Sequence, residues 1–397
     1  MDWSVQQDSA LSTVAAWLND DSALRNPVFR LFGYAGTGKT TLAKHFAADR
    51  NGVQFAAFTG KAASVMRSKG CVNATTIHSL IYRPRGKSGE YLRELETEVA
   101  GAEITPERLA IVQALIKEEK QNLKRPAFVL KPVEELEHVS LFILDEASMI
   151  SEQMAHDLLS FDIPILVLGD PAQLPPVKGT GYFTDVPPDV MLTEIHRQAQ
   201  DSPIIALATA VREGRHISRG RYGTSRVITK SELAPGEAMS HDQMLVGRNA
   251  TRHKCNARAR QLQGKDGALP VTGDRLVCLR NNHEIGLLNG EIWNTISSNV
   301  IDDDKLAMEL GDDGGVPITI KVHRHHFENR AEELGHWDHM SAQEFDYGYA
   351  LTVHKSQGSQ WPSVILFDES SCFRADARRW LYTGITRAAE RLTVVVG

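Results

Sequence analysis

Residues 28–48 read VFRLFGYAGTGKTTLAKHFAA, and this stretch decides the fold. The apolar residues 28–32 predict a buried strand, and residues 40–48 predict a helix. Between them, residues 33–40 match the pattern G-x-x-x-x-G-K-[ST]. Its glycines let backbone N–H groups wrap a phosphate chain, and the start of the helix adds its positive dipole end. We therefore expect a strand, a phosphate-binding loop and a helix that together bind a nucleoside triphosphate.

The loop residues have expected roles in binding a nucleotide, and ATP is the expected one. Lys39 would reach the β and γ oxygens, and the Thr40 hydroxyl would hold Mg²⁺. The main chain around the glycines would supply further donors. The residues that we expect to contact ATP in this loop are Gly33, Gly36, Thr37, Gly38, Lys39, Thr40 and Thr41.

Two acidic residues follow another apolar run, in LFILDEAS at residues 141–148. Ligands bind at the carboxyl ends of parallel strands, so this pair lies where a nucleotide site needs it. Asp145 is expected to bind the metal through water, and Glu146 to polarise the attacking water. The next apolar run leads into VLGDPAQLPPV at residues 167–177, where a proline-bounded loop presents Gln173. Gln173 is a candidate sensor of the γ-phosphate.

Apolar runs and helical segments alternate along the first part of the chain. Short apolar runs, each bounded by turn or polar residues, predict further strands at 53–58, 141–144 and 163–168. Strands that alternate with helices imply a parallel sheet with helices on both faces. Between residues 83 and 137 the pattern changes to charged, amphipathic residues at helical spacing, which predicts an inserted helical subdomain.

A second α/β block follows, and it carries an insert of its own. Residues 268–344 contain short alternating runs with N-N and N-G turns, which predict a small β-rich insert. The elements expected in the second block are helices at 203–211 and 251–263 and strands at 244–246, 349–353, 364–367 and 392–396. The expected division is 1–82 and 138–189 for the first core, 83–137 for its insert, 190–267 and 345–397 for the second core, and 268–344 for its insert.

Composition narrows the class of protein. The 397 residues are 42% hydrophobic and 24% charged, which is typical of a globular protein with two or more domains. A formal net charge of −6 means that binding to nucleic acid would depend on local basic patches. The cysteines are scattered without a C-x-x-C pair, no apolar run is long enough for a membrane span, and the N-terminus lacks the layout of a signal peptide. We expect a cytoplasmic protein that makes no membrane contact.

Eight short segments, in one order, cover nearly the whole chain. They are FGYAGTGKTT, FTGKAASVM, TTIHSLI, LDEASMI, GDPAQLPPV, EIHRQ, GYALTVHKSQGSQW and YTGITRAAERL. This series resembles the superfamily 1 DNA helicases of the RecD/Dda type. The resemblance implies two RecA-like P-loop cores with parallel sheets, with the helical insert in the first and a small SH3-like β-barrel insert in the second.

The same resemblance implies a motor that acts on DNA. Its cofactors would be ATP and Mg²⁺. It would hydrolyse ATP to move 5′ to 3′ on single-stranded DNA, and it would unwind duplex at duplex/single-strand junctions. It would act as a monomer, with replication, recombination or repair proteins as further partners.

The resemblance also implies roles for residues outside the phosphate loop. Gln7 is similar to the glutamine with which the family reads adenine, with Gln6 as the alternative. Arg197 in EIHRQ and Arg387 in GITRA resemble the two arginines that reach the γ-phosphate from the second core. A guanidinium in that position stabilises charge on the transferring phosphoryl group. The expected catalytic residues are Lys39, Glu146, Gln173, Arg197 and Arg387.

Nucleic-acid contacts are implied for polar residues that follow strands on the side away from the nucleotide. Small hydroxyls and basic side chains in such loops suit phosphate contacts. The run from residue 245 to 265 contains six basic residues and no acid, which indicates either a strand-binding face or a solvated helix surface. The expected contacts are Thr59, Lys61, Thr76, His78, Arg248, Asn249, Thr352, His354, Lys355 and Gln357.

Two further features have alternative interpretations. Trp361 either stacks on a base or packs in the core. The cluster of His323, Arg324, His325 and His326 lacks the spacing of a zinc site, and we interpret it as a polar hairpin tip of the β insert.

Three other functions remain open at this stage. The first is a single-strand translocase, or a helicase-like subunit, that does not unwind duplex by itself. The second is a P-loop NTPase without motor activity, which predicts an ATPase rate that does not respond to single-stranded DNA. The third is a binding module with a vestigial nucleotide site.

Overall fold

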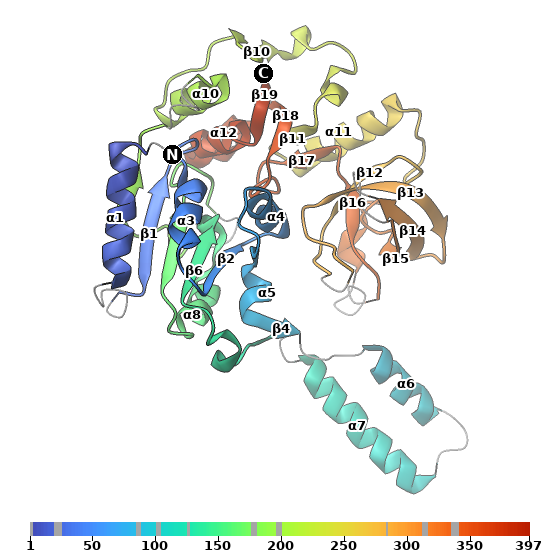
Figure 1. Ribbon diagram of the computed structural model, residues 1–397. Helices are drawn as coiled ribbons and strands as arrows, with labels where there is room; N and C mark the ends of the chain where they lie inside the picture. Colours follow the sequence, from blue (N-terminus) through green and yellow to red (C-terminus); the bar gives the residue numbers. More distant parts are fainter. Residues whose placement is uncertain are drawn as a thin grey trace.

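The computed structural model describes residues 3–19, 26–84, 89–100, 105–124, 128–175, 181–195, 201–282, 285–311, 317–334 and 341–397. Two α/β units lie side by side, and a β unit and a pair of helices extend from them (Figure 1). Within these ranges, no helix is long and apolar enough to cross a membrane.

The first α/β unit is a parallel sheet with helices on both faces, as the sequence predicts. Its strand order is β3-β2-β6-β7-β1-β8. The strands are β1 (Val28–Gly33), β2 (Val53–Ala57), β3 (Thr75–Thr76), β6 (Leu141–Asp145), β7 (Ile165–Gly169) and β8 (Val190–Leu192). The helices are α1 (Val5–Asn19), α3 (Lys39–Ala48), α4 (Gly60–Ser68), α5 (Ile77–Ile81) and α8 (Glu152–Leu159).

Alternating side chains of β1 explain the two covered faces. Phe29 and Leu31 belong to a buried cluster with α1, α3 and α4. Val28 and Phe32 belong to a second cluster, with α5 and α8. Because successive strand residues point to opposite faces, an apolar run such as this one is buried on both.

The second α/β unit is also a sheet of mainly parallel strands, in the order β17-β11-β18-β19-β10-β9, and only β9 runs antiparallel to its neighbour. Trp361 is buried at the start of β18, in the core of this unit, which corresponds to the packing alternative. The strands are β9 (Gly220–Tyr222), β10 (Ser225–Thr229), β11 (Gln243–Val246), β17 (Ala350–Thr352), β18 (Trp361–Phe367) and β19 (Ala388–Val396). The helices are α10 (Pro203–Arg212), α11 (Asn249–Leu262) and α12 (Ala377–Ile385).

The β insert of the second unit is an antiparallel sheet in the order β15-β14-β13-β12-β16. A single bridge between Val322 and Gln343 connects β15 to the residues that precede β16. Within the part of the chain that is described, this bridge is the only pairing that links β15 towards β16, so the ladder shows an antiparallel sheet and does not by itself show the barrel that the resemblance implies. The strands are β12 (Arg275–Cys278), β13 (Ile292–Val300), β14 (Lys305–Gly311), β15 (Ile318–His323) and β16 (Phe345–Tyr347).

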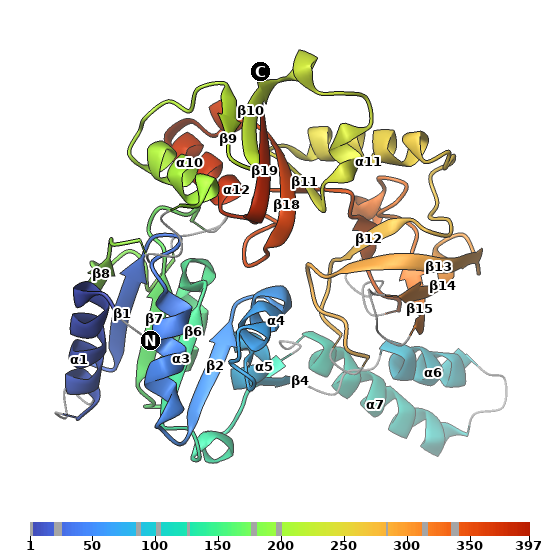
Figure 2. The same ribbon diagram turned by 45° about the horizontal axis from the view of Figure 1, so that its top comes forward.

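The helical insert is a pair of helices on a short stem. The stem is the antiparallel pair β4 (Tyr82–Pro84) and β5 (Phe128–Leu130), and the helices are α6 (Gly89–Ala100) and α7 (Pro106–Lys124). An exposed ion pair between Arg108 and Glu98 joins α7 to α6, with 2.6 Å between Nε and Oε1. The pair extends away from the first sheet (Figures 1 and 2).

Short 3₁₀ helices complete the described structure: η1 (Val133–Leu136), η2 (Ala147–Met149), η3 (Lys230–Glu232), η4 (Glu237–Ser240), η5 (Ala331–Glu333) and η7 (Ser370–Asp376).

Two element positions differ from the predicted division of the chain. β8 pairs with β1, so the first sheet extends beyond residue 189. β16 pairs with β12, so the β insert extends beyond residue 344. Both are three-residue strands, which are too short to show a hydrophobic period of their own.

The histidine cluster, which we predicted as a polar hairpin tip of the β insert, is largely buried. His323 ends β15 and is buried, and His325 is buried as well. The His325 ring lies 3.5 Å from a carboxylate oxygen of Asp304, and the His326 ring lies 3.2 Å from one of Glu344. Carboxylates from neighbouring parts of the insert therefore hold two of these rings inside it.

A buried histidine also joins two strands of the second α/β unit. His241 precedes β11, and its Nε2 lies 3.0 Å from the Thr393 hydroxyl on β19. Its Nδ1 lies 3.3 Å from the carbonyl oxygen of Glu237. Burial, together with the charges of Arg391 and Arg226, lowers the pKa of His241 from 6.5 to about 4.

This shift predicts a loss of stability in mild acid. The unfolded chain takes up a proton at His241 near pH 6.5, whereas the folded chain keeps the ring neutral down to about pH 4. The free energy of unfolding should therefore fall by roughly 2–3 kcal/mol as the pH is lowered through this window. Urea unfolding at pH 7 and pH 5 measures this fall in the free energy of unfolding, and the fall should be smaller in His241→Gln than in the wild type. It should not be smaller in His216→Gln, at an exposed position. An unchanged pH dependence in His241→Gln would refute the assignment.

Candidate active site

The phosphate loop connects β1 to α3 in the conformation that its glycines permit. Gly36 and Gly38 have φ values of 80° and 83°, which residues with a side chain rarely adopt. A Cβ atom at Gly33 would lie 2.5 Å from the Thr37 hydroxyl. Since α3 begins at Lys39, the N–H groups of its first turn face the loop. The loop therefore forms an anion cradle at a helix N-terminus.

Two side chains of the loop are fixed by short contacts. The Lys39 amine donates to the carbonyl oxygens of Gly33 (2.6 Å) and Tyr34 (3.1 Å). The Thr40 hydroxyl donates to the Asp145 carboxylate at 3.1 Å. The loop is thus already joined to the end of β6, where the acidic pair lies.

The acidic pair at the end of β6 has an unusual backbone. Glu146 has φ 54°, in the left-handed region, and its N–H donates to the Asp145 carboxylate at 2.8 Å. Burial raises the pKa of Glu146, and the neighbouring Asp145 raises it further, while Arg387 and Lys39 oppose the shift. The carboxyl group is therefore a stronger base than an exposed glutamate, which suits a group that accepts or orients a proton.

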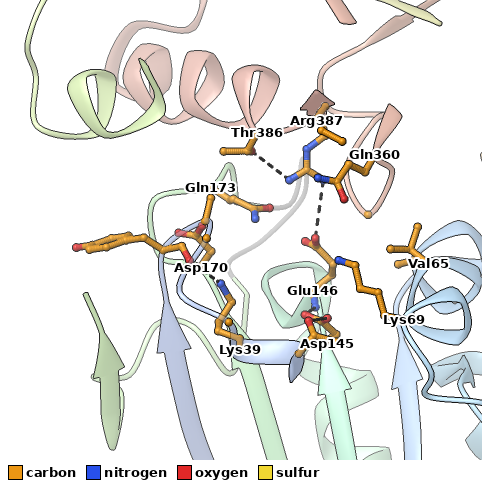
Figure 3. A pocket seen from close by; sticks show the side chains of 18 of the residues that line it. Lys39, Val65, Lys69, Asp145, Glu146, Asp170, Gln173, Gln360, Thr386 and Arg387 are labelled. Carbon is orange, nitrogen blue, oxygen red and sulfur yellow. Dashed lines mark hydrogen bonds and ion pairs between the residues drawn. The ribbon is translucent and has the colours of Figure 1, made fainter. Parts of the chain in front are cut away.

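Arg387 approaches this carboxylate from the second α/β unit. Its Nη1 atom lies 3.8 Å from Oε1 of Glu146, and its side chain is buried (Figure 3). The guanidinium donates to the carbonyl oxygens of Thr383 (3.1 Å) and Ser359 (3.2 Å), and to the Thr386 hydroxyl (3.3 Å). Since all three acceptors belong to the second unit, that unit fixes the charge that faces the first.

Gln173 lines the same space from the loop after β7. Its Oε1 atom is buried and has no hydrogen-bond partner among the residues that the structure describes. A buried oxygen without a donor costs free energy, which a ligand or a water molecule with a free proton would offset. The loop itself is held by Asp170, whose carboxylate accepts the N–H of Ala172 at 3.0 Å.

These residues surround a cavity of about 580 Å³ between the two α/β units. That volume is within the range of nucleotide and drug-sized pockets. The first unit contributes the phosphate loop, the acidic pair and Gln173, and the second contributes Arg387 (Figure 3). A nucleoside triphosphate fits the residues present, because the glycine cradle, an ammonium and a guanidinium suit its phosphates, and Gln173 offers an unused acceptor.

The two glutamines of α1 have different surroundings. Gln7 is buried, lines the cavity, and donates to the Thr37 carbonyl oxygen at 3.1 Å. Gln6 bonds instead to the edge strand β8, where its Nε2 donates to the Met191 carbonyl oxygen at 3.2 Å. The geometry therefore favours Gln7 over Gln6 for contact with a nucleotide base. Trp3 lines the cavity beside it, a residue that the sequence did not single out.

Arg197, the other arginine expected at the γ-phosphate, lies outside the described residues. The segment that follows it is visible as the start of α10, where Ser202, Ile204 and Ile205 line the cavity.

The predicted nucleic-acid residues of the first unit are placed at two helix starts. Thr59 caps α4 by accepting the N–H of Ala62 at 3.1 Å. Thr76 is buried and caps α5. Lys61 lies in the first turn of α4, and the His78 ring lies 4.3 Å from the ring of Phe128, at the stem of the helical insert. The two hydroxyls therefore have structural roles in addition to any contact with a ligand.

The predicted contacts of the second unit follow β17. Thr352 is buried and accepts the N–H of Lys355 at 3.3 Å, while Lys355 itself is exposed. The His354 ring lies 5.4 Å from the ring of Phe373, and burial lowers the pKa of this histidine. Gln357 is buried and donates to the Leu174 carbonyl oxygen of the first unit at 2.9 Å, so its amide is a contact between the two units in this structure.

Only part of the basic run from residue 245 to 265 is exposed. Acidic residues distant in sequence neutralise much of it, which periodicity alone could not reveal. Arg252 pairs with Asp346 at 2.6 Å, and both side chains are buried. Arg260 and Lys265 contact the fully buried Asp274, at 3.1 and 3.5 Å. In addition, Arg248 pairs with Glu369 at 2.8 Å; exposed positions of the run include Asn249, Lys254 and Arg258.

The structure also reveals two residues of the second unit that contact the phosphate loop and that the sequence did not single out. The Tyr382 hydroxyl lies between the phosphate loop and Asp170, and Arg212 lies over the ring of Tyr34. Tyr382 belongs to the YTGITRAAERL segment, so a signal was present, but nothing in that segment names the atoms of the other unit that it contacts.

Family models match both α/β units. Residues 21–231, more than half of the chain, match the model described as an AAA domain. Residues 347–395 match that of a UvrD-like helicase C-terminal domain.

Curated relatives are distant and longer than this chain. It is 26% identical over 422 residues to the ATP-dependent RecD2 DNA helicase of Deinococcus radiodurans, across 98% of this chain and 50% of that protein. It is 25% identical over 297 residues to a conjugal transfer protein TraA of Rhizobium radiobacter, across 66% of this chain and 25% of that protein. The chain thus spans half or less of the length of these two relatives.

Solved structures share the fold over nearly the whole chain. The Pif1 helicase of Candida albicans has a TM-score of 0.53 at 18% identity and covers 100% of this chain and 94% of its own. A Bacteroides Pif1 bound to single-stranded DNA has a TM-score of 0.53 at 16% identity, covering 99% and 92%. Two coordinating Pif1 helicases that unwind forked duplex DNA give a TM-score of 0.54 at 17% identity, covering 99% and 92%.

Proposed function

Because the chain belongs to the AAA-domain family and to the superfamily 1 helicases of the RecD and Pif1 type, we propose that it is an ATP-dependent DNA helicase. It hydrolyses ATP between its two α/β units, moves 5′ to 3′ on single-stranded DNA and unwinds duplex ahead of it. We propose this activity because the similar proteins are named as RecD2 and Pif1 helicases, and we propose the direction of movement from the same family.

One distance carries the proposal, the 3.8 Å between Arg387 of the second unit and Glu146 of the first. A nucleotide bound by the phosphate loop would lie between a fixed cation and a carboxylate that belong to different units. Hydrolysis would then change the forces between the two units, which is what a motor requires. A simple P-loop NTPase could keep its whole site within one unit.

Each residue of the cavity has a proposed task. Lys39 and the loop N–H groups hold the β and γ phosphates, and Gln7 contacts the base. Glu146 orients the attacking water, and Gln173 is proposed to sense the γ-phosphate by donating its amide N–H to a phosphate oxygen while its unpaired oxygen accepts from the attacking water. Arg387 stabilises the charge of the transferring phosphoryl group, and Arg197 is proposed to do the same.

Magnesium is the proposed metal. The Thr40 hydroxyl and the Asp145 carboxylate, 3.1 Å apart, are the oxygen ligands that Mg²⁺ prefers, and the phosphates and water would supply the others. The ion neutralises phosphate charge when it is bound. No group of three or more metal-ligating side chains occurs within the described ranges, which agrees with a metal that binds mainly through its nucleotide.

The strand path is proposed to cross both units on the side of α4, α5 and the loop after β17. Thr59 of the first unit and Gly358 of the second meet here, since a Cβ at Gly358 would lie 2.8 Å from the Thr59 hydroxyl. A change in the angle between the units would therefore act directly on bound DNA. The proposed contacts are Thr59, Lys61, Thr76, His78, Arg248, Asn249, Thr352, His354, Lys355 and Gln357.

The two inserts complete the proposed machine. The antiparallel insert is proposed to be an SH3-like barrel that closes around its single bridge, and the helix pair meets the duplex at a junction. We propose that the protein works as a monomer in the cytoplasm, with replication, recombination or repair proteins as partners. The predicted domain boundaries are proposed to hold, apart from the two strands noted above.

Two measurements test the proposal. The first is the ATPase rate with and without single-stranded DNA, and the second is the unwinding of duplexes that carry a 5′ or a 3′ tail. We expect single-stranded DNA to raise the ATPase rate, and duplexes with a 5′ tail to be unwound. A duplex with a 3′ tail of the same sequence is the control and should remain double-stranded. An ATPase that ignores DNA would refute the motor, and unwinding from the 3′ tail alone would refute the direction. Stimulated hydrolysis without any unwinding would identify a translocase or a helicase-like subunit.

A further inference from the structure

Two side chains of the second unit, which are not among the proposed catalytic residues, contact the phosphate loop. The hydroxyl of Tyr382, on α12, accepts the N–H of Ala35 at 2.8 Å. The guanidinium of Arg212, at the end of α10, lies 3.7 Å from the centre of the Tyr34 ring. Two successive residues of the loop are thus held by two helices of the other unit.

The Tyr382 hydroxyl also reaches the loop that carries Gln173. It donates to the Asp170 carboxylate at 2.7 Å, and both side chains are buried. Burial raises the pKa of Tyr382 far above its ordinary value, and the charge of Asp170 adds to this effect, so the hydroxyl keeps the proton that it donates. One oxygen atom therefore joins the phosphate loop, the Gln173 loop and α12.

The far end of α12 leads directly to Arg387. The helix ends at Ile385, and the Thr383 carbonyl oxygen accepts the Arg387 Nε at 3.1 Å. The Thr383 hydroxyl accepts the N–H of Leu174, next to Gln173, at 2.9 Å. The position of the catalytic guanidinium is therefore tied to the phosphate loop through less than two turns of one helix.

We propose that Tyr382 and Arg212 are positioning residues, which make the phosphate loop itself the joint between the two units. Through this joint, the conformation of the loop around ATP sets the distance from Arg387 to the reacting phosphate. The inference rests on the proposed ATPase function, and it adds residues that act through Arg387 and do not touch the nucleotide themselves.

Two contacts of Tyr34 can couple ATP binding in the loop to the second unit. The Lys39 amine donates to the Tyr34 carbonyl oxygen, and the ring of the same Tyr34 packs under Arg212. Phosphate oxygens compete with that carbonyl for the amine. Binding of ATP therefore acts on Tyr34, and through its ring on the second unit.

The first test removes one oxygen atom. Tyr382→Phe keeps the ring but leaves Ala35 and Asp170 without their partner. We expect kcat to fall by about tenfold to a hundredfold, because a small displacement of Arg387 is enough for such a loss, while KM for ATP stays within about twofold. Tyr349→Phe is the matched control, since this buried tyrosine donates to the buried Asp274 at 2.9 Å, away from the cavity. Its kcat should stay within about twofold of the wild type.

The second test changes the other contact at a partly exposed site, where folding is not at risk. Arg212→Met keeps most of the side-chain volume and removes the charge over Tyr34, so kcat should fall by about threefold or more. Arg215→Met is the control, because Arg212 and Arg215 both pair with Glu213, at 3.3 and 2.6 Å. A loss in both arginine variants, or in neither, would overturn the proposal for Arg212.

A double-mutant cycle separates positioning from a general structural effect. If Tyr382 acts through Arg387, adding Tyr382→Phe to Arg387→Ala should lower kcat by less than about twofold further. Independent, multiplicative losses would show that Tyr382 acts elsewhere and would overturn the inference. If the wild type hydrolyses ATP and Tyr382→Phe hydrolyses it at the same rate, the inference is overturned, whereas the proposed ATPase function stands. A wild type that does not hydrolyse ATP refutes the proposed function instead. If Tyr382→Phe fails to fold, the arginine pair decides.

Discussion

Arg387→Ala is expected to lower kcat for ATP hydrolysis by roughly a thousandfold, with ATP and single-stranded DNA still bound. The guanidinium is buried, held by three acceptors of the second unit, and faces Glu146 at 3.8 Å. It supplies charge where charge develops on the transferring phosphoryl group, so its loss affects the transition state more than the bound ground state.

A second effect adds to the first in this variant. Arg387 is the largest charge that opposes the raised pKa of Glu146. Without it the carboxyl group holds its proton to a higher pH, so kcat should rise more steeply with pH than in the wild type. Single-turnover hydrolysis across pH measures both effects. Arg391→Ala is the matched control, because this exposed arginine lies on β19, four residues after Arg387, donates to the Ser240 carbonyl oxygen and does not line the cavity. An Arg387→Ala protein within threefold of the wild type would rule out a composite site.

Lys39→Ala is expected to abolish measurable ATPase activity, a loss of about a thousandfold or more. Lys39 supplies the ammonium of the phosphate loop, and its present acceptors show that it reaches across the loop mouth. No other side chain of α3 can replace it, since Lys44 points to the Lys69 carbonyl oxygen on the outer side. Binding to single-stranded DNA should persist, because none of the proposed DNA contacts lines the cavity.

The controls for this variant come from the same helix. Lys44→Ala should retain the wild-type rate. Circular dichroism and thermal unfolding of Lys39→Ala will show whether the loop still folds, because two carbonyl groups lose their donor. Substantial hydrolysis by Lys39→Ala, in a preparation free of contaminating ATPase, would refute the assignment of the loop.

Most of the fold could be predicted because its strands are buried on both faces. Apolar runs such as residues 28–32 and 364–367 correspond to β1 and β18 within a few residues. The strands β8 and β9 were not predicted, because three-residue edge strands carry no period, and the five-residue β10 was not predicted either. The barrel closure of the β insert was a prediction from family likeness, and the ladder supports only an antiparallel sheet.

The candidate site could be predicted only where one short segment contains the chemistry. The phosphate loop and the acidic pair are each complete in sequence, and the structure brings them together through Thr40 and Asp145. The burial of Arg252 and Arg260 within the basic run could not be predicted, because their partners Asp346 and Asp274 are distant in sequence. Tyr382 was missed for the same reason, since its role depends on atoms of the other unit.

The helix pair on its two-stranded stem has a mechanical consequence. α7 has 19 residues and is therefore about 28 Å long. A rotation of about 10° at β4 and β5 would carry the far end through about 5 Å, because the pair behaves as a lever arm of that length. A tilt of the stem can be too small to disturb the sheet. It still moves the far end of the helix pair by enough to form or break contacts there.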